Sequence, residues 1–178
     1  MKSRLALICL FFSTLTSCQY HVRKFAGENP PAGTVVQWPQ AQYDEVRAYC
    51  YDYTAEKSRS FLNNGRIHAG VMDPSGVKLS REQVGRLVQA ITVSQPKSAR
   101  TPCYAPHHAF VFYSQGRAVA VFEMCFGCNQ FEGHPGGLPE YIDTQALWTL
   151  CKELNLPLGR GNEFYTNVVR EYRKAAVR

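Results

Sequence analysis

Three cysteines and two histidines between positions 103 and 128 are the residues most able to carry chemistry: Cys103, His107, His108, Cys125 and Cys128. In an exported protein such thiols oxidise to disulfides that hold the fold. The two short pairs Cys103-x3-His107 and Cys125-x2-Cys128 also have the spacing of a closed tetrahedral zinc site. A third use is thiol–disulfide exchange, for which C-x-x-C is the usual motif.

A β-hairpin is expected to bring these residues together. Two β-prone runs, 110–113 and 118–122, flank Ser-Gln-Gly-Arg, where Gly116 supplies the positive φ that a tight turn requires. A turn centred on Gln115 and Gly116 places Cys103 opposite Cys128. In the same register, Phe110 faces Val121, Pro106 faces Cys125, and His108 faces Glu123 in a surface cross-strand pair. The hairpin therefore favours a Cys103–Cys128 disulfide as a structural clamp.

Two alternatives to this clamp stay open. A structural zinc ion could be held by Cys103, His107, Cys125 and Cys128, and His107 and His108 point to opposite faces of a strand, so only one could join. Thiol exchange could use Cys103, Cys125 and Cys128. However, a thioredoxin-type motif needs a helix after the second cysteine, and residues 129–135 are poor helix formers.

The N-terminus has the three-part pattern of a secretory signal. Lys2 and Arg4 precede an apolar run over residues 5–15, which is too short to span a bilayer. The sequence Leu-Thr-Ser-Cys that ends at Cys18 resembles the lipobox of bacterial lipoproteins. That resemblance implies a signal peptide over residues 1–17, lipid attachment at Cys18 and a membrane anchor, and Gln19 implies sorting to the outer membrane. The alternative is an ordinary cleaved signal with Cys18 as a spare thiol.

Charge and length limit the remaining function classes. Loss of Lys2 and Arg4 with the signal peptide lowers the formal net charge from +6 to +4, which fits solubility better than nucleic-acid binding. The polar, proline-containing residues 18–40 indicate a flexible tether that begins at the lipidated cysteine. Residues 41–178 are long enough for a single domain with its own core.

The elements that must position the cysteines follow from local patterns. Strands are predicted over 46–53 and 66–71, and Gly133 to Gly137 is predicted to form a loop. A capping box at Ser80 predicts a helix, the leucine stripe behind Asp143 or Thr144 predicts a second, and a third lies in the tail. This order predicts an α+β fold, with a small antiparallel sheet of about four strands and helices packed on one face.

The domain also resembles a loose group of uncharacterised bacterial proteins. The resemblance rests on Cys103-Tyr104-Ala105-Pro106-His107-His108 and on Cys125-Phe126-Gly127-Cys128, which match a C-x-x-P-x-H … C-F-x-C pattern. Either His107 or His108 could match its histidine. The resemblance implies a shared α+β domain with a Cys/His centre, and it implies no activity.

These observations predict an envelope lipoprotein that faces the periplasm. Its expected role is structural or interactive rather than enzymatic, with the Cys/His hairpin as a clamp and another envelope protein as partner. No P-loop, nucleophile elbow, HExxH or GxGxxG sequence is present. The alternative is a zinc-binding or thiol-redox protein that uses Cys103, Cys125 and Cys128.

Overall fold

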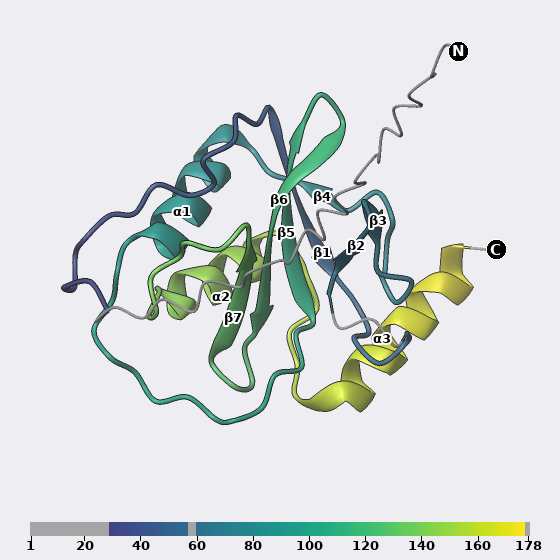
Figure 1. Ribbon diagram of the computed structural model, residues 1–178. Coiled ribbons are helices and arrows are strands. Elements are labelled where there is room, and N and C mark those ends of the chain that lie inside the picture. The colour runs from purple at the N-terminus through teal and green to yellow at the C-terminus, as the bar shows by residue number, and fades with distance from the viewer. Residues whose placement is uncertain (1–28, 57–59, 177–178) are drawn as a thin grey trace, which may run out of the picture.

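The computed structural model describes residues 29–56 and 60–176, which fold as an α+β domain (Figure 1). Five antiparallel strands form the main sheet in the order β4-β1-β5-β6-β7, and β2 and β3 form a small second sheet. The elements are β1 (Glu45–Cys50), β2 (Leu62–Asn63), β3 (Arg66–Ile67), β4 (Val77–Lys78), α1 (Arg81–Thr92), β5 (His108–Ser114), β6 (Arg117–Cys125), β7 (Gln130–His134), α2 (Thr144–Glu153) and α3 (Gly161–Ala176). The predicted fold class is confirmed.

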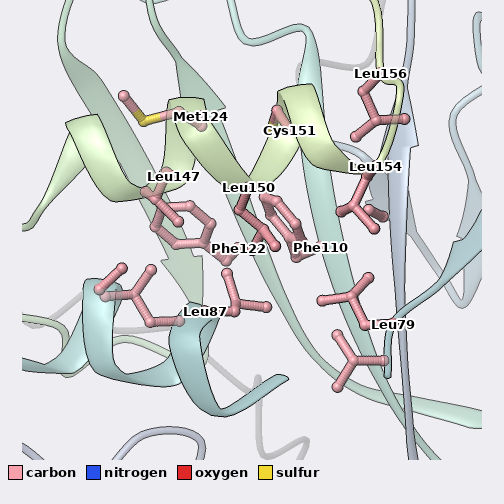
Figure 2. Close-up of a cluster of buried hydrophobic side chains, with 14 of the residues drawn as sticks. Leu79, Leu87, Phe110, Phe122, Met124, Leu147, Leu150, Cys151, Leu154 and Leu156 are labelled. Atoms are coloured by element: carbon pink, nitrogen blue, oxygen red, sulfur yellow. The ribbon is translucent and has the colours of Figure 1, made fainter. Parts of the chain in front are cut away.

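The main hydrophobic core lies between the sheet and the helices α1 and α2 (Figure 1). Phe110 and Phe122 from the central strands meet Leu87 of α1 and Leu147 and Leu150 of α2, and all five side chains are buried. Figure 2 shows these side chains directed toward one another from the sheet and the two helices. Because burial of each such side chain contributes about 1.5–3 kcal/mol, this core is the main source of stability.

A smaller core covers the opposite face of the sheet. Tyr49, Val111 and Val121 from the strands pack there on Phe61, which precedes the small second sheet, and Tyr51 directly after β1 joins them. Helix α3 joins the two sides: Tyr165 belongs to the main core, whereas the Tyr172 hydroxyl donates to Asp73 (3.1 Å). In Figure 1, α3 accordingly lies at the opposite side of the sheet from α1 and α2. The expectation that helices share one face therefore describes α1 and α2 and does not describe α3.

The predicted helix starts are confirmed by their caps. The Ser80 side chain accepts from the Gln83 N–H, and the Gln83 side chain accepts from the Ser80 N–H, which is a complete capping box. Asp143 caps α2 by accepting from the N–H of Ala146 (2.8 Å). These caps fix where each helix begins, and the apolar stripes fix which side is buried.

The β5–β6 hairpin has the predicted turn but a shifted register. Ser114 pairs with Arg117 across Gln115 and Gly116, which both have positive φ, as expected. The next pairs along the hairpin are Tyr113↔Ala118 and Phe112↔Ala120. Val119 therefore has no partner on β5 and forms a β-bulge in β6. Beyond the bulge every partner moves by one position. The prediction that Phe110 faces Val121 and His108 faces Glu123 is thus wrong.

The observed register determines which residues of β5 and β6 are cross-strand neighbours. Phe110 faces Phe122, Ala109 faces Glu123, and His108 faces Met124. A shift of one residue in register gives each side chain a new cross-strand neighbour. No pattern in the local sequence predicts the bulge that causes this shift.

The loop predicted over Gly133 to Gly137 begins only at Pro135, because Gly133 and His134 end the edge strand β7. Gly133 pairs with Phe122, and His134 pairs with Val121. A Cβ on Gly133 would come within 2.4 Å of Leu138 Cδ1, so a larger residue there would require the Leu138 side chain to shift. The strand was missed because an edge strand tolerates glycine that a central strand would not.

Part of the predicted tether belongs to the domain. The Val36 N–H donates to the Thr92 carbonyl (3.0 Å), and Val35 forms a bridge with Val93. Trp38 is 3% exposed, packs edge-on against Phe112 and donates its indole N–H to the Pro135 carbonyl (2.6 Å). The tether prediction over residues 18–40 is therefore wrong for residues 29–40, because this segment pairs with Thr92 and Val93 and its Trp38 belongs to the main core.

Candidate functional site

A pocket of about 720 Å³ lies at the open end of the β5–β6 hairpin. Cys103, Cys125, Cys128, His107 and His108 all line it. The opposite wall comes from residues that precede or begin α3, and Trp148 of α2 contributes as well. The hairpin thus gathers the five predicted residues at one place, although by a different register than expected.

The three sulfur atoms form the centre of this pocket wall. Cys103 and Cys128 have their Cα atoms 5.9 Å apart and their Sγ atoms at disulfide distance. The third sulfur is also near, because Cys125 Sγ lies 2.7 Å from Cys128 Sγ. Cys103 is exposed, whereas Cys125 and Cys128 are buried. Cys128 therefore has two sulfur neighbours, one of them open to solvent.

Loops rather than paired strand positions bring Cys103 to Cys128. Cys103 lies before β5 and Cys128 lies after β6. The Thr101 N–H donates to the Cys128 carbonyl (3.1 Å), and this bond holds the segment before β5 against the end of β6. The prediction had placed the two cysteines on facing strand positions, so the proximity has a different structural origin.

His107 is held by hydrogen bonds at both ring nitrogens. Nδ1 lies 3.0 Å from the Tyr51 carbonyl, and Nε2 lies 3.0 Å from Oδ1 of Asn162. Burial lowers the pKa of His107, so the ring is neutral at neutral pH. Since a carbonyl only accepts, we assign the proton to Nδ1, and the Asn162 amide must then be reversed so that its NH₂ group, rather than Oδ1, faces Nε2. Stacking on Tyr165, with ring centroids 3.9 Å apart, fixes the ring further.

His108 is buried more deeply and keeps one nitrogen unpaired. Its Nε2 lies 2.9 Å from the Pro157 carbonyl, which assigns the proton to Nε2. Nδ1 has no hydrogen-bond partner among the described residues. Burial lowers the pKa of His108 to about 4, so at neutral pH Nδ1 is a free acceptor. The strand pair with Glu123 that the sequence predicted is absent from the described sheet, because Glu123 faces Ala109.

The site geometry does not favour the zinc hypothesis. Both nitrogens of His107 are already engaged, and a zinc ligand must offer a free lone pair. Within residues 29–56 and 60–176, no group of three or more His, Cys, Asp or Glu side chains is arranged to hold a metal ion. The set Cys103, His107, Cys125 and Cys128 thus shares a pocket without forming a tetrahedral ligand group.

Two further cysteines lie apart from this sulfur cluster. Cys50 of β1 and Cys151 of α2 are buried in the main core, where Figure 2 shows Cys151 beside Leu150. Burial raises the pKa of Cys50 to about 12 and raises that of Cys151 as well. Because the thiolate is the reactive form, both residues act as small apolar side chains.

Glu123 is a buried carboxyl that the sequence-based interpretation had placed on the surface. It is 3% exposed, accepts from the Phe61 N–H, and accepts from the Tyr104 hydroxyl at 3.3 Å. Burial raises its pKa to about 7, and the nearby Glu132 adds to the increase. The only sequence signal was that Glu123 is an acidic residue within the otherwise apolar run of residues 118–125. The residues two positions away, which share its side of the strand, are Val121 and Cys125. Glu123 links β6 to the residue that follows Cys103.

The pocket wall opposite the sulfur atoms was not predicted. Gly159, Arg160, Gly161 and Asn162 line it, and they come from the link between α2 and α3. No pattern in the sequence connects this link to the hairpin, because the two segments meet only through the tertiary fold. Arg160 is exposed and forms no ion pair with any described residue.

The predicted lipid site, Cys18, and the signal peptide over residues 1–17 lie outside the described residues. In the described part of the chain, no helix has the length and apolar character needed to cross a bilayer. Comparison of the chain with protein-family models, with curated proteins and with solved structures found no match.

Proposed function

We propose that this chain is a lipid-anchored protein of the bacterial envelope whose domain carries a thiol–disulfide exchange site. Cys103, Cys125 and Cys128 form this site. The observation that carries the proposal is that Cys128 Sγ has both Cys103 Sγ and Cys125 Sγ within bonding or near-bonding distance at the wall of a pocket. A disulfide with only a structural role needs no third thiol beside it.

The exchange step is balanced within the protein. The Cys125 thiolate attacks Cys128 Sγ, the Cys125–Cys128 bond forms, and the Cys103–Cys128 bond breaks. Cys103 leaves as a thiolate and takes up the proton that Cys125 released. The number of thiols and disulfides stays constant, so this step needs no external oxidant or reductant. Its result is to present a free thiol at the exposed position.

Exposure assigns different roles to the three cysteines. Cys103 is the exposed residue of the three and is therefore assigned the contact with another molecule, whereas Cys125 and Cys128 are buried. A thiolate from a partner can attack Cys103 Sγ, form a mixed disulfide with Cys103, and release Cys128 as a thiolate. A second thiol of the partner then attacks the mixed disulfide and releases Cys103 as a thiolate, so that the partner leaves with a disulfide and the domain keeps two thiols. In the periplasm the partner would be a thiol of another envelope component.

A structural clamp remains the second candidate, and one observation favours it. The Thr101–Cys128 hydrogen bond and the Cys103–Cys128 pair fasten the same two segments, as a clamp would. On the chain-entropy model a disulfide across such a loop stabilises the fold by roughly 3 kcal/mol. The two candidates differ in whether Cys125 ever replaces Cys103 as the partner of Cys128.

Substitution of Cys125 separates the candidates. In the oxidised native protein, iodoacetamide is expected to alkylate Cys103 slowly, because exchange releases its thiolate and alkylation traps it. The Cys125→Ser variant is expected to lose this labelling, since a hydroxyl cannot displace the disulfide. Cys151→Ser is the matched control, because it removes a thiol from the core without touching the site. Peptide mass spectrometry locates the label.

Two results would contradict the exchange site. One is labelling of Cys103 at the same rate in Cys125→Ser as in the unchanged protein. The other is complete resistance of Cys103 to alkylation in the unchanged protein, with Cys125 as the only free thiol of the three. The second result would support the clamp.

The lipid anchor has its own test at Cys18. The Cys18→Ser protein is expected to incorporate no fatty-acid probe, and its signal peptide is expected to remain largely uncleaved. The reason is that the lipobox cysteine both accepts the lipid and defines the cleavage position. The soluble domain from residue 29 onward should melt at the unchanged temperature. Wild-type levels of probe incorporation in Cys18→Ser would exclude lipidation at this cysteine.

A further inference from the structure

The pocket beside the exchange site has the charge of an anion-binding site. The residues that line it include Arg160 and no aspartate or glutamate. Arg160 has no acidic partner among the described residues, so its charge is available to a bound molecule. A volume of about 720 Å³ is in the usual range for small-molecule sites, roughly 300–1,000 Å³.

The start of α3 adds to this positive character. Gly161 and Asn162, the first two residues of the helix, line the pocket on the same wall as Arg160. The first N–H groups of a helix have no partner within the helix and carry partial positive charge. The Asn162 side chain is turned to His107 rather than back to this helix end. The N–H groups and the guanidinium therefore act on one side of the pocket.

The remaining walls of the pocket carry no charge. His108 lines the pocket, but its Nδ1 has no contact with solvent, so it is not offered to a molecule in the pocket. The sulfur atoms and the cationic wall thus border one cavity, although they come from the β5–β6 hairpin with its flanking residues and from the α2–α3 link.

We infer that the pocket binds a small thiol that carries a carboxylate, and that Arg160 holds this carboxylate while the thiol attacks Cys103. This inference rests on the proposed exchange site and names its substrate class. The attacking thiolate forms a mixed disulfide with Cys103, the Cys103–Cys128 bond breaks, and Cys128 leaves as the thiolate. The small thiol is the reductant, and the protein disulfide is the oxidant.

Arg160 is a binding residue in this scheme and takes no part in the sulfur chemistry. Its effect should therefore depend on the charge of the attacking thiol. An arginine–carboxylate contact at an exposed position is worth up to about 1 kcal/mol, which corresponds to a rate effect of about threefold to fivefold. Salt should weaken the effect, because the contact is solvent-accessible.

Three thiols of similar size provide the test: anionic 3-mercaptopropionate, neutral 2-mercaptoethanol and cationic cysteamine. The rate at which each opens the Cys103–Cys128 bond is measured by acid quenching and mass spectrometry, in the unchanged protein and in Arg160→Gln. For each thiol the two proteins are compared with one another, so the intrinsic reactivity of the thiol cancels. Arg81→Gln on α1 is the control, since it removes one positive charge away from the pocket.

The expected result is selective. Arg160→Gln should slow 3-mercaptopropionate about threefold to fivefold, leave 2-mercaptoethanol within about twofold, and not slow cysteamine. Arg81→Gln should change none of the three. Equal slowing of all thiols, or no slowing of 3-mercaptopropionate, would overturn the inference and leave the exchange site intact. If none of the thiols opens the bond in the native protein, the exchange site itself is wrong.

Discussion

Replacement of Trp38 by alanine is expected to lower the free energy of unfolding by about 3–5 kcal/mol, the usual cost of removing a buried aromatic side chain. Trp38 is 3% exposed, packs edge-on against Phe112 with ring centroids 5.3 Å apart, and donates its indole N–H to the Pro135 carbonyl. Its loss would leave a cavity beside the central strands and an unpaired carbonyl. Denaturant unfolding of the purified domain measures the change.

Val35 gives the matched control for this prediction. It lies three residues earlier in the same segment, but its side chain is 69% exposed. Val35→Ala should therefore change the free energy of unfolding by less than about 0.5 kcal/mol. If Trp38→Ala were as mild as Val35→Ala, residues 29–40 would be a free tether after all, and the boundary of the domain would return to residue 41.

The second large effect concerns pH and the buried carboxyl of Glu123. Its pKa is raised from 4.5 to about 7, so the folded protein holds a proton that the unfolded chain releases. A raised pKa contributes stability that is complete below about 4.5 and is lost as the pH rises through about 7. Between pH 5 and pH 8 this loss amounts to roughly 2–3 kcal/mol.

His107 and His108 change the stability in the opposite direction as the pH rises. The loss due to Glu123 would therefore be masked if only the unchanged protein were measured. Burial lowers the pKa of both histidines, and their stabilising contribution is lost as the pH falls. Both proteins contain the two histidines. Their contribution therefore cancels when the free energy of unfolding of the unchanged protein is subtracted from that of Glu123→Gln. We expect the variant to gain roughly 2–3 kcal/mol relative to the unchanged protein from pH 5 to pH 8, measured by denaturant melts.

Glu82→Gln is the control for Glu123→Gln, because the Glu82 side chain is 85% exposed on α1. Its difference from the unchanged protein should stay nearly constant over the same pH range. A flat difference for Glu123→Gln as well would show that Glu123 is ionised throughout, and that its contacts with Phe61 and Tyr104 do not depend on a proton.

Local sequence patterns predicted the parts of the fold that local interactions determine. The capping box at Ser80, the Asp143 cap and the tight turn at Gln115 and Gly116 each depend on residues within one turn of chain, and each is confirmed. The burial of Leu87, Leu147 and Leu150 follows from helical periodicity in the same way.

The remaining features depend on contacts that the sequence does not display. The bulge at Val119 shifts the hairpin register without a glycine or proline to mark it. Gly133 lies in an edge strand because it pairs with Phe122 of β6, and Glu123 is contacted by Phe61 and Tyr104 from distant segments. Arg160 and Asn162 reach the pocket only through the packing of α3.

The candidate site was predicted in composition but not in arrangement. The sequence identified Cys103, Cys125, Cys128 and the two histidines, and all of them line one pocket. It could not assign their roles, because the engagement of both His107 nitrogens and the position of Cys125 beside Cys128 are properties of the folded chain.

The central claim is that Cys125 can replace Cys103 as the disulfide partner of Cys128. The disulfide map of the oxidised domain tests this claim most directly. After native alkylation, acid quenching and proteolysis, mass spectrometry should find Cys125 linked to Cys128 in chains whose Cys103 carries the label. Cys103 linked to Cys128 should remain in the unlabelled chains. A map that contains only Cys103–Cys128 at every time point, with label on Cys125 or on none of the three, would contradict the exchange site.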